Sequence, residues 1–452
     1  MVTADLNLGT ALQIWPISIT ALTCGCTLLL AGSIGDALGA KIMYICGTFL
    51  QAVFVLGSGL SRNAFEIILF RGLTGVAISF CLPSAVSIIT SCFGGKKRNM
   101  AFAFLGAGQP VGFSIGLILG GLLTQHVTWR VGFHIGAGII ASNIILIVWA
   151  VPAQAAHELS WEAKKRKILH DIDWIGAGLA SVSLAMSSYV FAAITGSTGS
   201  IKDPVNIVLL CFSMVLVPVF VVWVGRQEKK GRPALIPNSL WRNRYFTTVC
   251  LAVFLAWGNF NSLETMLTFY FQDAQLLTPF QTSIRFLPAA VAGIVMELAA
   301  GILVHRVSAH LLVNVGLFVT CIAPLLMTFA TPTSSYWSTG FVANILNPIG
   351  VDCLFTAANL LISASFPQKT QALAGGVFNT ASQIGKSVGI ALTAVVASSV
   401  TEHSKFPNKD TPDALMKGYH ASFWYGFGIC CLTCVIGLIG LKDVGKVGHK
   451  RD

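Results

Sequence analysis

Long apolar stretches alternate with short polar connections along the whole chain, and this pattern constrains the fold more than any other feature. Most stretches are close to the ~20 residues that an α-helix needs to cross the hydrocarbon of a bilayer. Inside a bilayer the backbone must satisfy its own hydrogen bonds, and a helix does so within one segment. The sequence therefore predicts an all-α polytopic membrane protein with thirteen spans. The predicted spans are 13–35, 42–60, 65–93, 100–123, 130–151, 173–195, 204–226, 245–272, 284–304, 309–329, 337–365, 371–400 and 420–441.

The scarcity of charged residues supports the same conclusion. Hydrophobic residues make up 54% of the chain and charged residues 10%, whereas a soluble domain carries about 25% charged residues. A chain with so few charges cannot cover its surface in water, so lipid must be the solvent for most of that surface. The net charge of +11 does not indicate a nucleic-acid partner, because the basic residues cluster in short connections between spans.

The distribution of these basic clusters predicts the topology. Lys96–Arg98, Lys164–Lys167 and Arg226–Arg232 occupy alternate connections, which the positive-inside bias places in the cytoplasm. The C-terminus is then cytoplasmic, and thirteen spans place the N-terminus on the opposite side. We therefore expect that one further helix normally precedes this sequence, and that its absence reflects a truncated gene model or a shortened product.

Four glycine-rich or arginine-containing motifs stand out against this background. The run Gly32 to Lys41 has the spacing G-x-x-x-D-x-x-G-x-K, and Gly301 to Val307 is a weaker echo of it. Arg71-Gly72-Leu73-Thr74-Gly75 lies within a predicted span. Gly112-x-x-x-Gly116-Leu117-x-x-Gly120-Gly121 lies within the following one.

These motifs resemble those of the major facilitator superfamily, a large group of secondary transporters. Thr74 stands where the family's R-x-x-q-G motif has glutamine, and Leu117 replaces the proline of its antiporter motif g-x-x-x-G-P-x-x-G-G. The stretches Pro233–Asn243 and Phe378–Gln383 are similar to a fungal subgroup that includes aminotriazole-resistance, boron-efflux and low-affinity ammonium transporters. The chain thus resembles the fungal fourteen-spanner drug:proton antiporter branch without its first helix.

The resemblance implies a major facilitator fold, with two six-helix halves related by an axis along the membrane normal and a central inserted helix pair. The expected domains are an N-terminal half at 1–152, a cytoplasmic basic loop at 153–172, the inserted pair at 173–226, a cytoplasmic linker at 227–244, a C-terminal half at 245–441 and a cytoplasmic tail at 442–452.

Two sets of residues are candidates for gating. The first set belongs to the run Gly32 to Lys41. The resemblance implies that this set forms a cytoplasmic latch, although its residues alone also fit a plain turn. The stripe of glycines four residues apart in the second set favours close helix packing, to which the resemblance adds a role in sealing and rocking the two halves. The loop set is Gly32, Asp36, Gly39 and Lys41, and the helix set is Gly108, Pro110, Gly112, Gly116, Gly120 and Gly121.

Ionisable side chains within predicted spans are candidates for the transport pathway, because each costs about 2.5–3.5 kcal/mol or more in lipid. Asp352 lies on a polar stripe with Asn359, and Glu264 lies in line with Asn261. We expect Asp352 and Glu264 to include the carboxylate that couples protons, with a structural ion pair or hydrogen bond as the alternative. The remaining pathway candidates are Arg71 from the helix motif and the stripe of Asn379, Gln383 and Lys386.

Two other ionisable residues in the spans favour structural roles. Glu297 lies between Gly293 and Gly301, which indicates a tightly packed helix face. His134 is alone on an apolar span, as expected for a hydrogen-bonded core histidine.

The sequence therefore predicts a secondary active transporter that exports small molecules or drugs in exchange for protons, by alternating access. One alternative is a facilitator or importer of a small solute such as ammonium or borate, and another is a non-transporting or inactive truncated membrane protein. No phosphate loop, nucleophile elbow or metal-ligand cluster indicates an enzyme, a cofactor or a metal site. We expect a monomer, in the plasma membrane rather than the vacuolar membrane.

Overall fold

The computed structural model describes residues 5–6, 15–93, 95–151, 162, 165–166, 172–196, 203–232, 234–303, 307–365, 368–409 and 411–442. Across these residues every predicted span is helical and no strand occurs, which confirms the predicted fold class. The long helices are α2 (Trp15–Leu38), α3 (Ala40–Leu60), α4 (Ala64–Cys92), α5 (Gly95–His126), α6 (Trp129–Ala150), α8 (Trp174–Gly196), α9 (Pro204–Lys229), α10 (Arg244–Phe269), α12 (Leu287–Leu303), α13 (Ala309–Met327), α14 (Gly340–Ser365), α15 (Gln368–Glu402) and α16 (Pro412–Gly440).

Twelve segments of the described chain are long and apolar enough to cross a membrane, and α8 adds a shorter apolar run at Trp174–Ser187. The expected basic loop at 153–172 and the tail at 442–452 lie largely outside the described residues, as do His305 and Arg306 of the echo motif.

Helix ends depart from the sequence prediction where apolarity alone set the boundary. The predicted span 284–304 is two helices, α11 (Pro279–Arg285) and α12, with Phe286 between them. A capping box joins Thr278 and Gln281 at the start of α11, so polar residues extend the helical segment beyond the apolar stretch. Likewise α10 continues as a π-helix, Tyr270–Ala274.

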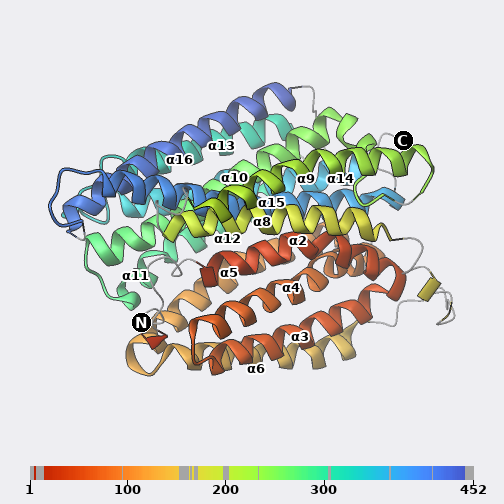
Figure 1. Cartoon of the computed structure of the whole chain (residues 1–452), viewed down its shortest axis with the longest axis horizontal. Coiled ribbons are helices and arrows are strands. Elements are labelled where there is room, and N and C mark those ends of the chain that lie inside the picture. The colour runs from red at the N-terminus through yellow and green to blue at the C-terminus, as the bar shows by residue number, and fades with distance from the viewer. Residues whose placement is uncertain are drawn as a thin grey trace. The chain divides into compact units, whose positions relative to one another are not determined.

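The chain forms two compact units, each built from segments that are distant in sequence. The first contains residues 1–94, 129–243 and 368–387. The second contains 95–128, 244–367 and 388–452. In the first unit α4 packs on both α2 and α3, and α3 packs on α6 (Figure 1). In the second unit α14 packs on α10, α12 and α13, and α5 packs on α11 and α12. The domain boundaries expected from chain order stay a prediction.

Small residues let α2 and α4 approach closely in the first unit. Thr23 Oγ1 donates to the carbonyl of Gly72 at 2.7 Å, and Thr27 Oγ1 donates to Ser79 Oγ at 2.8 Å. A Cβ atom added to Gly75 would overlap Thr23 Oγ1. Threonine hydroxyls and glycines of this kind hold helices together in lipid, where apolar burial gives little drive. The R-x-x-T-G motif therefore supplies a helix-packing surface.

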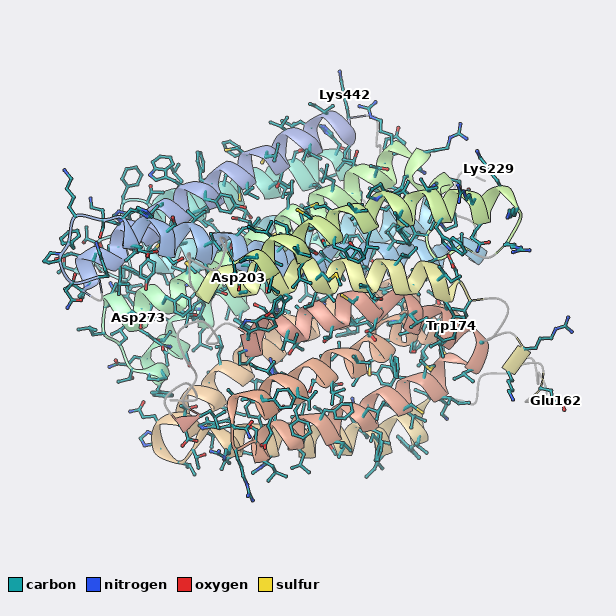
Figure 2. All side chains as sticks on the ribbon, viewed as in Figure 1. Glu162, Trp174, Asp203, Lys229, Asp273 and Lys442 are labelled. Carbon is teal, nitrogen blue, oxygen red and sulfur yellow. The ribbon has the colours of Figure 1, made fainter. Side chains whose placement is uncertain are left out.

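Hydrogen bonds within each unit show which helix ends lie together. In the first unit Lys41 Nζ donates to the Val151 carbonyl at 2.5 Å, which joins the start of α3 to the end of α6. Figure 2 places Trp174 and Lys229 at one end of the α8–α9 pair and Asp203 at the other. In the second unit Arg244 Nη2 donates to the Ile439 carbonyl at 2.5 Å. The packed pairs α3 and α6, α8 and α9, and α10 and α16 therefore run antiparallel.

The other end of the first unit is closed by the N-terminal segment. Arg130 Nη1 bonds Asp5 Oδ2 at 2.5 Å, and Trp129 Nε1 donates to the same oxygen at 3.0 Å. These two hydrogen bonds, Arg130 first, hold the pKa of the Asp5 carboxyl below its ordinary value. The carboxylate therefore stays charged at every pH above the ordinary pKa of an aspartate. Over that range Asp5 remains bonded to the start of α6.

Asp173 connects α8 and α9 to the segment that follows them. Its Oδ1 accepts from Gly176 N at 2.8 Å and from Trp223 Nε1 at 2.9 Å, and its Oδ2 accepts from Leu235 N at 3.3 Å. The side chain is 8% exposed. One buried carboxylate therefore caps α8 and satisfies donors from α9 and the segment leading to Arg244.

Replacing Asp173 with alanine is expected to destabilise the first unit. The change leaves three donors near the core without their acceptor, at a cost of about 3 kcal/mol, since each buried unsatisfied donor costs about 1–3 kcal/mol. Asp203→Ala is the matched control, because Asp203 caps the neighbouring helix through one exposed bond to Val205 N and its loss costs about 1 kcal/mol. Thermal unfolding of the purified protein in detergent measures both. Equal shifts for the two variants would contradict the role given to Asp173.

Candidate functional site

Two acidic side chains meet where α12 packs on α14 in the second unit. Glu297 of α12 is 6% exposed, and its Oε1 accepts from Thr356 Oγ1 of α14 at 3.1 Å. Asp352 lies one helical turn before Thr356, and its Oδ2 is buried without a hydrogen-bond partner among the described residues. Both Glu297 and Glu264 of α10 lie close enough to act electrostatically on Asp352. Three neighbouring helices thus bring three carboxyl groups together within the membrane-spanning region.

Glycine and proline residues shape the walls around these acids. A Cβ atom added to Gly293 would lie 3.5 Å from Asp352 Oδ2 and 3.2 Å from Pro110 Cβ of α5. A Cβ atom added to Gly106 would overlap the Glu297 carboxyl group. The α5 backbone therefore passes directly beside Glu297, which explains the place of a glycine there.

The polar stripe of α14 is used for packing as well as for the acid cluster. Asn347 Nδ2 donates to the Phe260 carbonyl of α10 at 3.3 Å, and Gly350 N donates to Thr320 Oγ1 of α13 at 2.8 Å. Asn359 Nδ2 bonds back to the Phe355 carbonyl of its own helix at 3.0 Å. On α10, Asn261 Nδ2 likewise donates to the Trp257 carbonyl at 2.9 Å. Asn359 and Asn261 thus each donate within their own helix. The carboxyl groups are the chemically distinctive members of the predicted set.

The other predicted pathway residues lie in the first unit. Arg71 Nε donates to the Pro16 carbonyl at 3.0 Å, and its guanidinium carbon is 6.0 Å from the centre of the Phe133 ring. Lys386 acts electrostatically on Cys24 of α2. Gln383 packs beside Gly25, where an added Cβ atom would lie 3.3 Å from Gln383 Cβ. The prediction that these residues share one pathway with the acids stays a prediction.

A cavity of about 60 Å³ lies at the junction of α2, α3, α4 and α15 in the first unit. Gly32 and Asn379 both line it, together with Pro83 and Ser84. Asn379 Nδ2 donates to the Gly375 carbonyl of its own helix at 2.9 Å. The structure therefore brings a loop candidate and a pathway candidate to one small cavity.

The predicted gating loop is a tight connection between α2 and α3. Gly39 has φ +103°, a conformation that favours glycine because it has no Cβ atom. Lys41 binds the last carbonyls of α6, Val151 at 2.5 Å and Val148 at 3.4 Å, where a cation also suits the helix dipole. The side chain of Asp36 lies outside the described residues.

The predicted glycine stripe of α5 is not where this helix makes its close contacts in the second unit. No described atom of that unit lies within 4 Å of a Cβ added to Gly108, Gly112, Gly116 or Gly120. By contrast, a Cβ on Gly121 would lie 3.1 Å from Phe280 Cα and from the Pro279 carbonyl oxygen of α11. Within the second unit α5 therefore approaches its neighbours closely at Gly106 and Gly121. These two glycines are not spaced by a multiple of four residues.

Sequence reasoning assigned Glu297 a structural role and so missed its position beside Asp352. Spacing gave no signal for this position, because Glu297 and Thr356 lie on different helices, 59 residues apart in the chain. The expectation for His134 was wrong in part. Its Nε2 is buried without a hydrogen-bond partner among the described residues and packs over Gly59.

Comparison with known sequences agrees with the predicted resemblance. The sequence model described as Major Facilitator Superfamily matches residues 1–390 and 290–449. MFS-type transporter 1 of Pyricularia oryzae is 40% identical, over 98% of this chain and 80% of its own length. The low affinity ammonium transporter of Saccharomyces cerevisiae is 26% identical over 92% and 78%. The aminotriazole resistance protein of the same yeast is 24% identical over 93% and 75%.

The fold is also similar to solved transporter structures. The human organic anion transporter MFSD10 (TETRAN) superposes with a TM-score of 0.63 at 16% identity, covering 94% of this chain and 83% of that one. At this identity the likeness concerns the fold alone.

The adjacent glycines Gly120 and Gly121 give a matched test of α5 packing. Gly120→Ala is expected to be neutral or to stabilise by up to about 1 kcal/mol, because alanine favours a helix. Gly121→Ala is expected to destabilise by about 1–3 kcal/mol, because the new Cβ meets α11 backbone that cannot rotate away. Unfolding of the two variants in detergent measures the difference. A Gly120 variant that is the less stable of the two would contradict the described packing of α5.

Proposed function

The chain belongs to the major facilitator superfamily, and from this premise we propose that it is a proton-coupled exporter of small molecules or drugs. Export proceeds by alternating access, in which the substrate site opens to one side of the membrane at a time. The C-terminus lies in the cytoplasm and the protein works as a monomer in the plasma membrane. Asp352 and Glu297 bind and release the coupling proton, and Glu264 belongs to the same pathway.

The observation that carries this proposal is the acid cluster on α10, α12 and α14. A carboxylate in the membrane is costly unless it pairs with a cation, meets water or takes up a proton. Asp352 Oδ2 has no hydrogen-bond partner among the described residues, and its electrostatic neighbours include the acids Glu297 and Glu264. Since like charges at one site cannot all remain ionised cheaply, the cluster is suited to exchange a proton as its surroundings alternate between water and protein.

Glu297 has a distinct part in this scheme. Ionised, it accepts from the Thr356 hydroxyl, and α5 backbone at Gly106 covers its other side. A proton on Glu297 converts a hydrogen-bond acceptor into a donor. This changes the hydrogen bond that Glu297 makes with Thr356 of α14 and its contact with the α5 backbone. Proton binding at Glu297 would therefore alter the contact between three helices.

The names of two relatives favour different functions. One favours export, and the other favours the uptake of a small solute. The aminotriazole resistance protein is named for resistance to a toxic compound, which suits a chain that removes such compounds from the cell. The low affinity ammonium transporter favours a facilitator or importer of a small solute on the same fold. The two candidates differ in whether transport depends on the proton gradient.

Neutralising Asp352 is expected to abolish proton-driven efflux. Cells that express the chain and are loaded with labelled aminotriazole should release it faster than cells without the chain, and a protonophore should remove this difference. Asp352→Asn and Glu297→Gln should each reduce the efflux rate at least tenfold, because neither amide can bind and release a proton. Asp413→Asn is the control, since Asp413 is an exposed acid at the start of α16 in the same unit.

Two further measurements separate the alternatives. Exchange of labelled for unlabelled aminotriazole across proteoliposomes needs no net proton movement, so the Asp352 variant should retain exchange while losing efflux. Uptake of methylammonium that persists in the presence of protonophore would contradict export and support the facilitator. Efflux that is undiminished in both acid variants would contradict coupling through this cluster.

A further inference from the structure

A cavity in the described part of the second unit lies away from the acid cluster. It has a volume of about 410 Å³ and lies between α11, the start of α12 and the segment that enters α14. Its apolar walls include Ile284, Leu287 and Phe341, and its rim carries Trp337, which is 69% exposed. Arg285 is the one cation that lines it.

Arg285 is held in place by an unusually complete set of contacts. Its Nη1 donates to Gln275 Oε1 at 2.5 Å, and its carbonyl accepts from Tyr336 Oη at 2.8 Å and Asn344 Nδ2 at 3.1 Å. The guanidinium carbon lies 5.2 Å from the centre of the Phe271 ring and 5.0 Å from that of Tyr336. Cation–π contacts of this geometry orient a guanidinium without neutralising it.

The backbone next to Arg285 is irregular in a way that positions Gln275. The π-helix Tyr270–Ala274 ends directly before Gln275, and Leu276 has φ +55°. Gln275 Nε2 then donates to Tyr270 Oη at 2.9 Å and to the Ser334 carbonyl at 3.1 Å. A leucine in this conformation costs about 1–2 kcal/mol. This strain is compensated by a network that turns the Gln275 oxygen towards Arg285.

The charge of Arg285 has no counter-ion on the described protein surface. Among the described residues no carboxylate lies within ion-pair distance of this guanidinium. It lies in the first two turns of the candidate span Pro279–Leu303, and its cavity is also lined by Tyr336 and Trp337, which precede the candidate span that begins at Gly340. Exposed tryptophans such as Trp337 concentrate at this depth, level with lipid headgroups.

From this geometry we infer that the cavity is a phospholipid site. The lipid phosphate binds the Arg285 guanidinium, and one acyl chain lies along Ile284, Leu287 and Phe341. Arginine is suited to phosphate because its planar N–H donors match two phosphate oxygens. An open groove with a fixed cation at headgroup depth and apolar walls below it matches a phospholipid in both charge and shape. The lipid bridges α11 to the segment that enters α14.

Three probes distinguish the contribution of the phosphate to binding from that of the acyl chains. The full-length protein in dodecyl maltoside is titrated with dioleoylphosphatidylcholine, with dioleoylglycerol, which lacks phosphate, or with glycerol 3-phosphate, which lacks acyl chains. The phospholipid should raise the melting temperature by several degrees and remain bound in native mass spectrometry. Equal binding of dioleoylglycerol would overturn phosphate recognition, and a full shift with glycerol 3-phosphate would indicate a soluble-anion site instead.

Variants then assign the site to Arg285. Arg285→Gln should weaken phospholipid binding at least tenfold, whereas Arg62→Gln, at an exposed arginine of the first unit, should leave it unchanged. Ile284→Trp places a large ring in the groove at a side chain that is 46% exposed. It should block binding with the fold intact, even if Arg285→Gln fails to fold. Wild-type lipid retention in a folded Ile284→Trp variant would overturn the inference.

Discussion

A polar group inside a bilayer has no water to bond, and this single constraint organises the structure. Backbone groups meet it by forming helices, and hydroxyls meet it by bonding carbonyls of their own or a neighbouring helix. Thr23 bonds the Gly72 carbonyl in the first unit, and in the second Thr320 Oγ1 donates to the Leu346 carbonyl and accepts from Gly350 N. Each such bond needs a backbone within reach, so glycine accompanies it. Small residues and hydroxyls therefore occur together wherever two helices cross closely.

The same constraint explains why the carboxyl groups are gathered. Glu297 uses the Thr356 hydroxyl as its partner, and Gly106 allows α5 to cover the remaining side. Asp352 has both Glu297 and Glu264 of α10 as electrostatic neighbours. Three acids on separate helices respond together to any change in their surroundings, whereas an isolated acid would respond alone. A proton taken up by one of them lowers the cost of charge on the others, which links protonation to helix contacts.

Much of this fold is predictable from sequence because the bilayer sets the length of each element. Every predicted span corresponds to a helix, and the stripe of Asp352, Thr356 and Asn359 follows from a spacing of three and four residues. The break at Phe286 was not predicted, because a boundary set by apolarity alone does not show where one helix ends and the next begins. The contact of Glu297 with Thr356 joins residues 59 positions apart, and spacing within one helix carries no information about which faces of two helices meet. For the same reason the stripe of α5 glycines did not reveal the close contacts of Gly106 and Gly121 within the second unit.

Arg285 and Asp352 respond to the same physical problem in opposite ways. Asp352 is an acid enclosed by helices, among other acids, so a mobile proton is the smallest partner able to reach it. Arg285 is a cation whose charge stays permanently on, because a guanidinium does not release its proton in proteins. It must therefore keep a lasting partner, and aromatic faces fix its direction without satisfying its charge. At headgroup depth the abundant anion is phosphate, which is why we propose proton exchange for Asp352 and phospholipid binding for Arg285.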